Sequence, residues 1–264
     1  MFSPFTIALK YIGYWFGSSN GKGHGIHSPF VFDFIRNVLN DRNAYPEYKS
    51  VEQLRTRLLA DHTPVPFEEF GAGNKTGVLS RSVSAIVRRS AKNQKYGQLL
   101  FRMAKHYRPH YVLELGTSLG ISTAYLAAAD ETSVVVSGEG NDAVANMAKS
   151  NLAWVGLNNV RVVTGNFDNT LPEMVARMPH VDLAFIDGNH RRQPTLNYFR
   201  ELLTKTTSES IIIFDDIHWS RGMESAWNEI RQHPSVKLSI DLFFFGLVFF
   251  REEFKTRQHF RIRF

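Results

Sequence analysis

From residue 110 onward, short apolar segments alternate with amphipathic segments of helical length. The segments that read as strands are 110–115, 133–138, 159–164, 181–187, 210–215, 235–241 and 244–251. Helices are expected between the first six of them, at 120–129, 141–155, 169–178, 193–204 and 218–232. This alternation predicts parallel strands joined by right-handed crossovers. The last two strands leave no room for a helix and must form an antiparallel hairpin. The sequence therefore predicts a doubly wound α/β fold with a seven-stranded, mostly parallel sheet and a C-terminal antiparallel hairpin.

The first part of the chain has a different pattern, which predicts helices joined by loops. The expected helices are 5–16, 29–40, 49–60, 77–91 and 96–107. Glycine-rich stretches at 17–30 and 62–77 read as loops. The segment GAGNKTG at 71–77 does not satisfy the P-loop pattern, so we interpret it as a turn. We expect a helical N-terminal cap region over 1–95 and one doubly wound α/β domain with a ligand-binding function over 96–264.

Charge is unevenly distributed along the chain. Residues 1–110 hold 16 Lys and Arg against 7 Asp and Glu, whereas residues 111–264 hold 15 against 18. The two parts are therefore expected to meet different partners. The chain has no Cys, no basic leader before a clean apolar core and no apolar run long enough to span a bilayer. We expect a cytoplasmic protein without a transmembrane segment. The two-sided pattern of residues 5–16 leaves a helix on a membrane surface as an alternative.

A glycine loop follows the first strand of the alternating part. In YVLELGTSLGIST, residues 111–123, Glu114, Gly116 and Gly120 form the pattern E-x-G-x-x-x-G. Gly116 allows a tight turn and a close approach of the backbone to a ligand. Ser122 and Thr123 fall in the first turn of the next helix, where free N–H groups bind polar ligand groups. Glu114 offers a carboxylate to a cationic group.

The second strand ends at Glu139, 19 residues after Gly120. An acid at this distance can hold both ribose hydroxyls of an adenosyl group. A dinucleotide is disfavoured, because the loop lacks the second glycine of G-x-G-x-x-G and places Glu114 where a pyrophosphate would be repelled. A glycine loop that links a strand to a helix and binds nothing is the remaining alternative. With the closing hairpin, the pattern is typical of class I methyltransferases.

The stretch YGQLLFRMAKHYRPHYVLELGTSLGISTAYLA resembles the small O-methyltransferases typified by catechol O-methyltransferase. The phrases FIDGNH and IIIFDDIHW resemble a bacterial branch that includes sugar O-methyltransferases. The resemblance covers residues 96–250 and implies S-adenosylmethionine as cofactor. It implies that the methionine end is lined by Glu114, Gly116, Ser118 and Ser122. It also implies that Glu139 binds the ribose, that Asn166 and Phe167 lie near the adenine, and that Asp187 contacts the cofactor.

Three carboxylates follow the fourth and fifth strands: Asp187 after one, Asp215 and Asp216 after the other. Parallel neighbours end on the same side of a sheet, so these anions should converge and repel one another unless a cation joins them. Mg²⁺ or Ca²⁺ accepts such oxygen ligands. The spacing is similar to the metal triad of the O-methyltransferases, although Asp216 stands where the catechol enzyme has Asn. In the alternative interpretation, Asp187 touches only the cofactor and Asp216 caps a helix.

His190, three residues after Asp187, occupies the offset of a lysine that the resemblance identifies as the proton acceptor. Histidine suits that task near neutral pH. We therefore take His190 and Asp187 as candidate catalytic residues. His218, His24 and His27 are weaker candidates, and a solvated loop histidine is the alternative.

The sequence thus favours an S-adenosylmethionine-dependent methyltransferase that acts on a hydroxyl of a small, anionic acceptor, with Mg²⁺ as a candidate metal. One alternative is a nucleic-acid methyltransferase, because residues 75–108 contain nine basic residues and no acidic residue. The other is a non-catalytic module that keeps the cofactor pocket. The oligomeric state, including a homo-oligomer, and the acceptor are left open.

Overall fold

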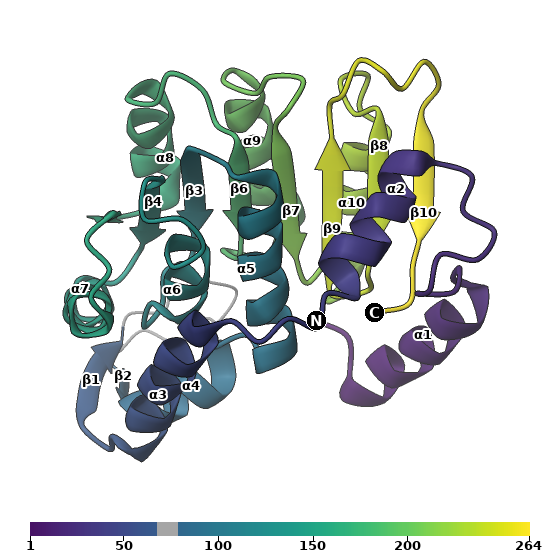
Figure 1. The fold of residues 1–264 in the computed structure, drawn as a ribbon. Coiled ribbons are helices and arrows are strands. Elements are labelled where there is room, and N and C mark those ends of the chain that lie inside the picture. The colour runs from purple at the N-terminus through teal and green to yellow at the C-terminus, as the bar shows by residue number, and fades with distance from the viewer. Residues whose placement is uncertain (68–78) are drawn as a thin grey trace. The chain divides into compact units, whose positions relative to one another are not determined.

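The computed structural model describes residues 1–67 and 79–264 (Figure 1). The chain forms two compact units. The first unit combines Met1–Asp41 with Met178–Phe264, and the second is Arg42–Arg177.

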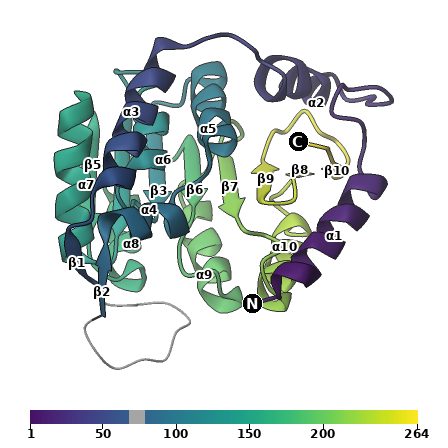
Figure 2. The same cartoon turned by 90° about the horizontal axis from the view of Figure 1, so that it is seen from below.

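The second unit carries three parallel strands, and the middle one pairs with each of the other two. These strands are β3 (Tyr111–Leu115), β4 (Val134–Glu139) and β5 (Val160–Thr164). The helices of this unit are α3 (Pro46–Ala60), α4 (Val83–Ser90), α5 (Gln94–Tyr107), α6 (Ile121–Ala127), α7 (Asp142–Val155) and α8 (Phe167–Ala176). A separate antiparallel ribbon joins β1 (Pro64–Phe67) to β2 (Leu79–Ser82). Helices α6 and α8 lie on opposite sides of β3 and β4 (Figure 2), so both faces of these strands are covered.

The residues of the second unit explain this arrangement. Val112, Leu113 and Leu115 on β3 are fully buried, as expected for a strand with helices on both faces. Side chains cap several helices, for example Asn93 at the start of α5 and Asn141 at the start of α7. The carboxyl ends of the parallel strands are therefore fixed at one edge, where α6, α7 and α8 begin.

The first unit contains the remaining strands and three long helices. Its strands are β6 (Leu183–Ile186), β7 (Ile211–Asp215), β8 (Leu238–Asp241), β9 (Phe245–Phe249) and β10 (Gln258–Arg261). Its helices are α1 (Pro4–Gly17), α2 (Pro29–Phe34), the π-helical turn η1 (Ile35–Leu39), α9 (Arg192–Leu203) and α10 (Arg221–Arg231). β6 and β7 are parallel, whereas β9 runs antiparallel to both β7 and β8. Strands β8 and β9 follow one another in the chain and form the C-terminal hairpin.

The structure confirms the α/β fold class, the mostly parallel sheet and the C-terminal hairpin. It corrects the number of strands, because β10 pairs in parallel with β8 and adds an eighth strand to the seven expected. It also corrects the helix expected over 77–91. Residues 79–82 form β2, and the helix begins only at Val83. The turn expected at 71–77 lies outside the described residues.

The division of the chain at residue 95 stays a prediction. Within residues 1–67 and 79–264, no helix is both long enough and apolar enough to cross a membrane.

Candidate functional site

The loop between β3 and α6 is held against the end of β4. The backbone N–H groups of Gly116 and Thr117 both donate to the carbonyl of Gly138, at 2.9 and 3.0 Å. Gly120 then adopts a φ of 88° and caps α6. Residues other than glycine adopt this conformation only at an energetic cost. The glycines of E-x-G-x-x-x-G thus create a tight turn at the carboxyl end of the sheet, as the sequence predicted.

Glu139 is the acidic side chain at this edge. Its Oε2 accepts a hydrogen bond from the backbone N–H of Ser118 at 2.8 Å, and its Oε1 accepts one from the N–H of Asn141 at 3.0 Å. Ser118 has a φ of 48°, which is uncommon outside glycine. Burial raises the pKa of Glu139, although the N–H donors of Asn141, Ser118 and Gly140 oppose this shift. The carboxylate is therefore fixed between two loops.

Glu114 is fully buried rather than placed at the surface of the loop. Its Oε2 accepts hydrogen bonds from the hydroxyl of Thr123 and, at 2.6 Å, from that of Ser137. These contacts connect β3 to α6 and β4. Sequence reasoning missed this role of Thr123 and Ser137. The signal available was a hydroxyl residue in each of the two elements, α6 and β4, that contact the strand of Glu114. The predicted contact of Glu114 with the methionine end stays a prediction.

The residues predicted for the adenine lie near the same strand end. Asn166 caps α8, where its Oδ1 accepts from the N–H of Asp168 at 3.0 Å. The ring of Phe167 is 3.3 Å from the position that a Cβ would take at Gly138, the neighbour of Glu139. Ser122 is buried in the first turn of α6. The second unit therefore gathers the predicted cofactor residues other than Asp187 around the ends of β3, β4 and β5.

In the first unit, a cluster of ionisable groups forms after β6 and β7. Asp187, His190 and Asp215 each offer one ligand atom, and these atoms lie within 4.8 Å of one another. The His190 Nε2 is 3.4 Å from the Asp187 Oδ1. Asp215 is buried, whereas Asp187 and His190 are partly exposed. The predicted metal trio of Asp187, Asp215 and Asp216 shares Asp187 and Asp215 with this group and stays a prediction.

The position of His190 sets its protonation. Burial alone lowers its pKa, but the hydrogen bond and charge of Asp187 and the charges of Asp215 and Asp216 outweigh burial and raise the pKa to about 8. Three nearby carboxylates thus stabilise the imidazolium form. The geometry suits either a base oriented by Asp187 or a nitrogen ligand beside two carboxylates.

The other candidate histidines lie elsewhere. His218 bridges two acids, with its Nδ1 3.2 Å from Glu224 Oε1 and its Nε2 3.0 Å from Asp241 Oδ2. His24 and His27 are exposed in the loop before α2. None of the three belongs to the ionisable cluster found among the described residues.

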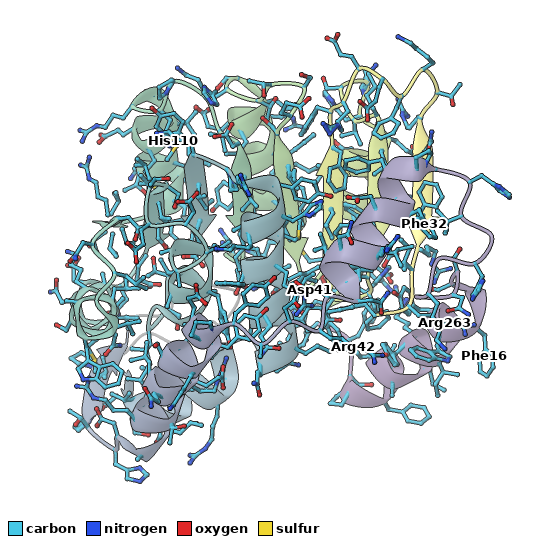
Figure 3. The ribbon with its side chains drawn as sticks, viewed as in Figure 1. Phe16, Phe32, Asp41, Arg42, His110 and Arg263 are labelled. Atoms are coloured by element: carbon cyan, nitrogen blue, oxygen red, sulfur yellow. The ribbon has the colours of Figure 1, made fainter. Side chains whose placement is uncertain are left out.

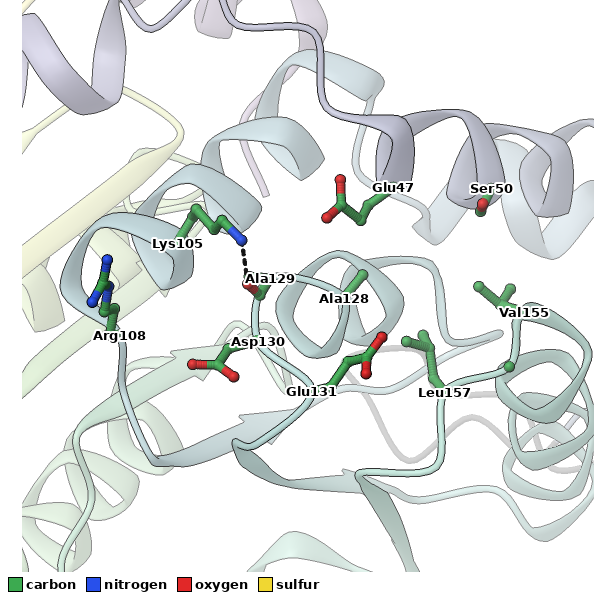
Figure 4. A pocket seen from close by; sticks show the side chains of 11 residues that line it. Glu47, Ser50, Lys105, Arg108, Ala128, Ala129, Asp130, Glu131, Val155 and Leu157 are labelled. Carbon is green, nitrogen blue, oxygen red and sulfur yellow. Dashed lines mark hydrogen bonds between the residues drawn. The ribbon is translucent and has the colours of Figure 1, made fainter.

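A cavity of about 560 Å³ opens at the opposite edge of the second unit (Figure 4). Its charged lining residues are Glu47, Lys105, Arg108, Asp130 and Glu131. Arg108 precedes β3, and Asp130 and Glu131 precede β4, so the cavity lies at the amino ends of the strands. Ligands of open α/β sheets bind at the carboxyl ends. This cavity is therefore not the cofactor site.

Comparisons with known proteins agree with the geometry. Residues 113–217 match the family model described as a methyltransferase domain. No curated protein matches the chain in sequence. Several solved structures are similar in fold. The O-methyltransferase from Bacillus cereus, in complex with SAH, has a TM-score of 0.56 and 20% identity, and covers 83% of this chain and 97% of that one.

Two further structures show the same likeness. The SAH-bound methyltransferase PaMTH1 from Podospora anserina has a TM-score of 0.59 and 14% identity, and covers 85% of this chain and 97% of that one. The O-methyltransferase TomG from Streptomyces achromogenes, which is involved in tomaymycin synthesis, is in complex with SAM. It has a TM-score of 0.56 and 17% identity, and covers 79% of this chain and 91% of that one. Residues 113–217 thus match a methyltransferase domain, and the fold of the chain is similar to the folds of these methyltransferases.

Proposed function

We propose that the chain is an S-adenosylmethionine-dependent enzyme that transfers a methyl group to a hydroxyl of a small molecule. The observation that carries this proposal is the fixed carboxylate of Glu139, which lies beside the glycine turn at the end of β4. A ribose diol needs an acceptor that is held in place, and the N–H groups of Ser118 and Asn141 hold this one.

The residues of the second unit fit the cofactor. Each oxygen of the Glu139 carboxylate accepts one backbone N–H, and an ionised carboxylate has about four acceptor positions, which leaves room for two hydroxyls. The turn at Gly116 brings backbone rather than side chains to the strand edge. Phe167, against Gly138, offers an aromatic surface for a purine. The fixed carboxylate of Glu139 favours an adenosyl group over a pyrophosphate, because a carboxylate repels the negative charge of a pyrophosphate.

When bound, S-adenosylmethionine supplies a methyl group activated by a sulfonium centre. The protein then mainly has to bind the acceptor, orient it and exclude water. His190 is the candidate group to accept the hydroxyl proton, and Asp187 orients its ring through Nε2. With a pKa raised to about 8, His190 is mostly protonated at neutral pH, so its capacity as a base increases with pH.

Asp187 and Asp215 are the residues that would hold a divalent cation, with Asp216 as the third acid of the predicted trio. Their fit rests on the approach of two carboxylates and one imidazole in a partly buried place. A cation there would offset the negative charge and lower the pKa of a hydroxyl.

The acceptor and the compartment are further parts of the proposal. The excess of basic residues in residues 75–108 supports an anionic methyl acceptor. Arg81 lies in β2, whereas Arg88 is exposed at the end of α4. We place the enzyme in the cytoplasm, where a chain without Cys suits the reducing conditions.

The experiment has two stages. Calorimetry with S-adenosylmethionine, its demethylated product and NAD tests the cofactor, and tight binding of NAD alone would overturn the proposal. Incubation of the pure protein with isotope-labelled cofactor and a small-molecule extract, followed by mass spectrometry, tests the reaction. Labelled O-methyl products support it. Label found only in nucleic acid would assign the enzyme to another class, and cofactor binding without any labelled product would indicate a non-catalytic module.

A further inference from the structure

Helix α1 exposes one continuous apolar face. Phe5, Leu9, Ile12 and Phe16 are 73%, 53%, 52% and 80% exposed, and they recur at intervals of four, three and four residues. We call these four residues the α1 stripe. Six of the ten large exposed hydrophobic residues of the described chain lie within residues 1–16, so this exposure is concentrated rather than scattered. A concentrated patch of this kind marks an interaction surface.

The opposite face of α1 is firmly attached within the same unit. Tyr14 is buried and donates its hydroxyl to the carbonyl of Ile262. Tyr11 packs edge-on against Phe243 with ring centroids 5.0 Å apart. Lys10 Nζ is 2.9 Å from Glu224 Oε1 on α10. The α1 stripe is therefore the outer surface of a docked helix, and its exposure does not come from a helix that has failed to pack.

The charges around the C-terminal end of α1 are basic. Arg263 donates from Nε to the carbonyl of Trp15 at 2.7 Å, and its guanidinium lies over the Trp15 ring at 5.2 Å. Arg261 lies over Tyr14, and Lys22 is exposed just beyond the helix. Phe16 and Arg263 lie at the same end of α1 (Figure 3). The arginines also complement the helix dipole.

Acidic groups offset this basic rim at Arg261. Helix α1 contains no Asp or Glu. Glu224 is paired with Lys10, and Asp241 is buried and paired both with His218 and, at 3.9 Å, with Arg261. An occupant of the α1 stripe therefore meets apolar side chains bordered by positive charge.

We propose that α1 docks the protein on the surface of an anionic lipid bilayer, with the α1 stripe inserted at the level of the headgroups. Its 14 residues give a length of about 21 Å, too short for the roughly 30 Å hydrocarbon core, so the helix lies in the plane of the interface. Trp15, 41% exposed beside the stripe, is a residue type that favours this region. Lys22 and Arg263 supply the attraction to anionic headgroups, whereas the charge of Arg261 is offset by Asp241.

Charge also argues against a second copy of the chain as the occupant. Two copies packed stripe against stripe would each present Lys22 and Arg263 to a helix that carries no acid. An anionic bilayer supplies the complementary charge, and it requires no matching surface of defined shape.

The test is flotation of the full chain with vesicles, without cofactor or acceptor, so its outcome is independent of the proposed methyl transfer. One vesicle is phosphatidylcholine alone, and the other contains about 30% phosphatidylglycerol as the anionic lipid. We expect binding to the anionic vesicle. The double variant Leu9→Asp, Phe16→Asp should bind at least about tenfold more weakly, because two apolar anchors are lost. Lys22→Gln should weaken binding about fivefold.

Trp154→Asp is the matched control, because Trp154 is 52% exposed on α7, in the second unit. It should bind like the unchanged protein. Circular dichroism should show unchanged helix content in all variants, since the altered side chains face outward. Absence of binding to the anionic vesicle would overturn the proposal, as would equal loss in Trp154→Asp. A dimer in light scattering that the double variant abolishes would assign the α1 stripe to a second copy and also overturn it.

Discussion

The backbone N–H of Ser118 donates to Glu139 Oε2 at 2.8 Å and thereby connects the turn after β3 to the end of β4. The two residues are far apart in the sequence but belong to one feature, because the turn positions the carboxylate. Our first prediction follows from this contact. Glu139→Ala should weaken S-adenosylmethionine binding more than about tenfold, since it removes charge-assisted hydrogen bonds worth about 1.5–3 kcal/mol.

Calorimetry measures this effect, and Glu173→Ala is the control. Glu173 is an acid on α8 in the same unit, and its side chain is 74% exposed. The control should bind the cofactor normally. Equal affinity of the Glu139→Ala variant and the unchanged protein would separate this carboxylate from the ribose.

The second prediction concerns the pH dependence of cofactor binding. Burial raises the pKa of Glu139 above its ordinary value of 4.5, despite the opposing donors of Asn141, Ser118 and Gly140. The ionised form accepts the ribose hydroxyls, so affinity should decrease as the pH falls through this raised pKa, earlier than an exposed Glu would give. The Glu139→Gln variant should bind weakly at neutral pH and lose the acid-side decrease. A decrease that persists in Glu139→Gln would assign it to another group.

The third prediction compares two helical glycines. A Cβ at Gly97 on α5 would lie 2.4 Å from the ring of Tyr125, which is fully buried and donates to Glu52 at 2.6 Å. Gly97→Ala should therefore lower the free energy of unfolding by about 1–3 kcal/mol, because the packed ring has no free space. At Gly13 on α1, no atom lies within 4 Å of the added Cβ. Gly13→Ala should raise the free energy of unfolding by about 0.5–1 kcal/mol through helix propensity.

Urea unfolding followed by circular dichroism measures both changes. A stabilising Gly97→Ala would show that the Tyr125 ring moves aside at little cost.

The pattern of strands and helices was sufficient to predict the edge of the sheet at which Glu139 lies. Strand and helix lengths determine where each strand ends, so an acid 19 residues after Gly120 could be placed without coordinates. The direction of a side chain beyond a strand end could not be predicted in the same way. Asn189, His190 and Asp216 have φ values of 68°, 31° and 53°, which no propensity indicates.

This limit explains the difference at the ionisable cluster. Strand ends predicted that Asp187, Asp215 and Asp216 converge, and local backbone geometry also brings His190 to Asp187 and Asp215. Strand β10 was missed for another reason. The segment QHFR is short and mostly polar, and it is recognisable as a strand only from its pairing with β8.

The fourth prediction separates metal ligands from the base in this cluster. If Asp187 and Asp215 hold a divalent cation, Asp187→Asn and Asp215→Asn should each weaken Mn²⁺ binding at least about tenfold, because an amide lacks the charge that a hard cation requires. Mn²⁺ suits both carboxylate and imidazole donors and can be followed by electron paramagnetic resonance. Asp182→Asn is the matched control. Asp182 lies in the same unit, 3.1 Å from His180, and pairs with a histidine without belonging to the cluster.

His190→Ala then decides between two roles. If His190 is the base, its loss should leave Mn²⁺ affinity within about threefold and reduce methyl transfer strongly. The rate of methyl transfer in the unchanged protein should then rise with pH, because the pKa of His190 is raised to about 8. A tenfold loss of Mn²⁺ affinity in His190→Ala would instead make His190 a ligand, and proton removal would pass to water. Mn²⁺ binding that is unaffected by either aspartate variant, or full activity in excess chelator, would contradict the metal site. The carboxylates would then act only by raising the pKa of His190.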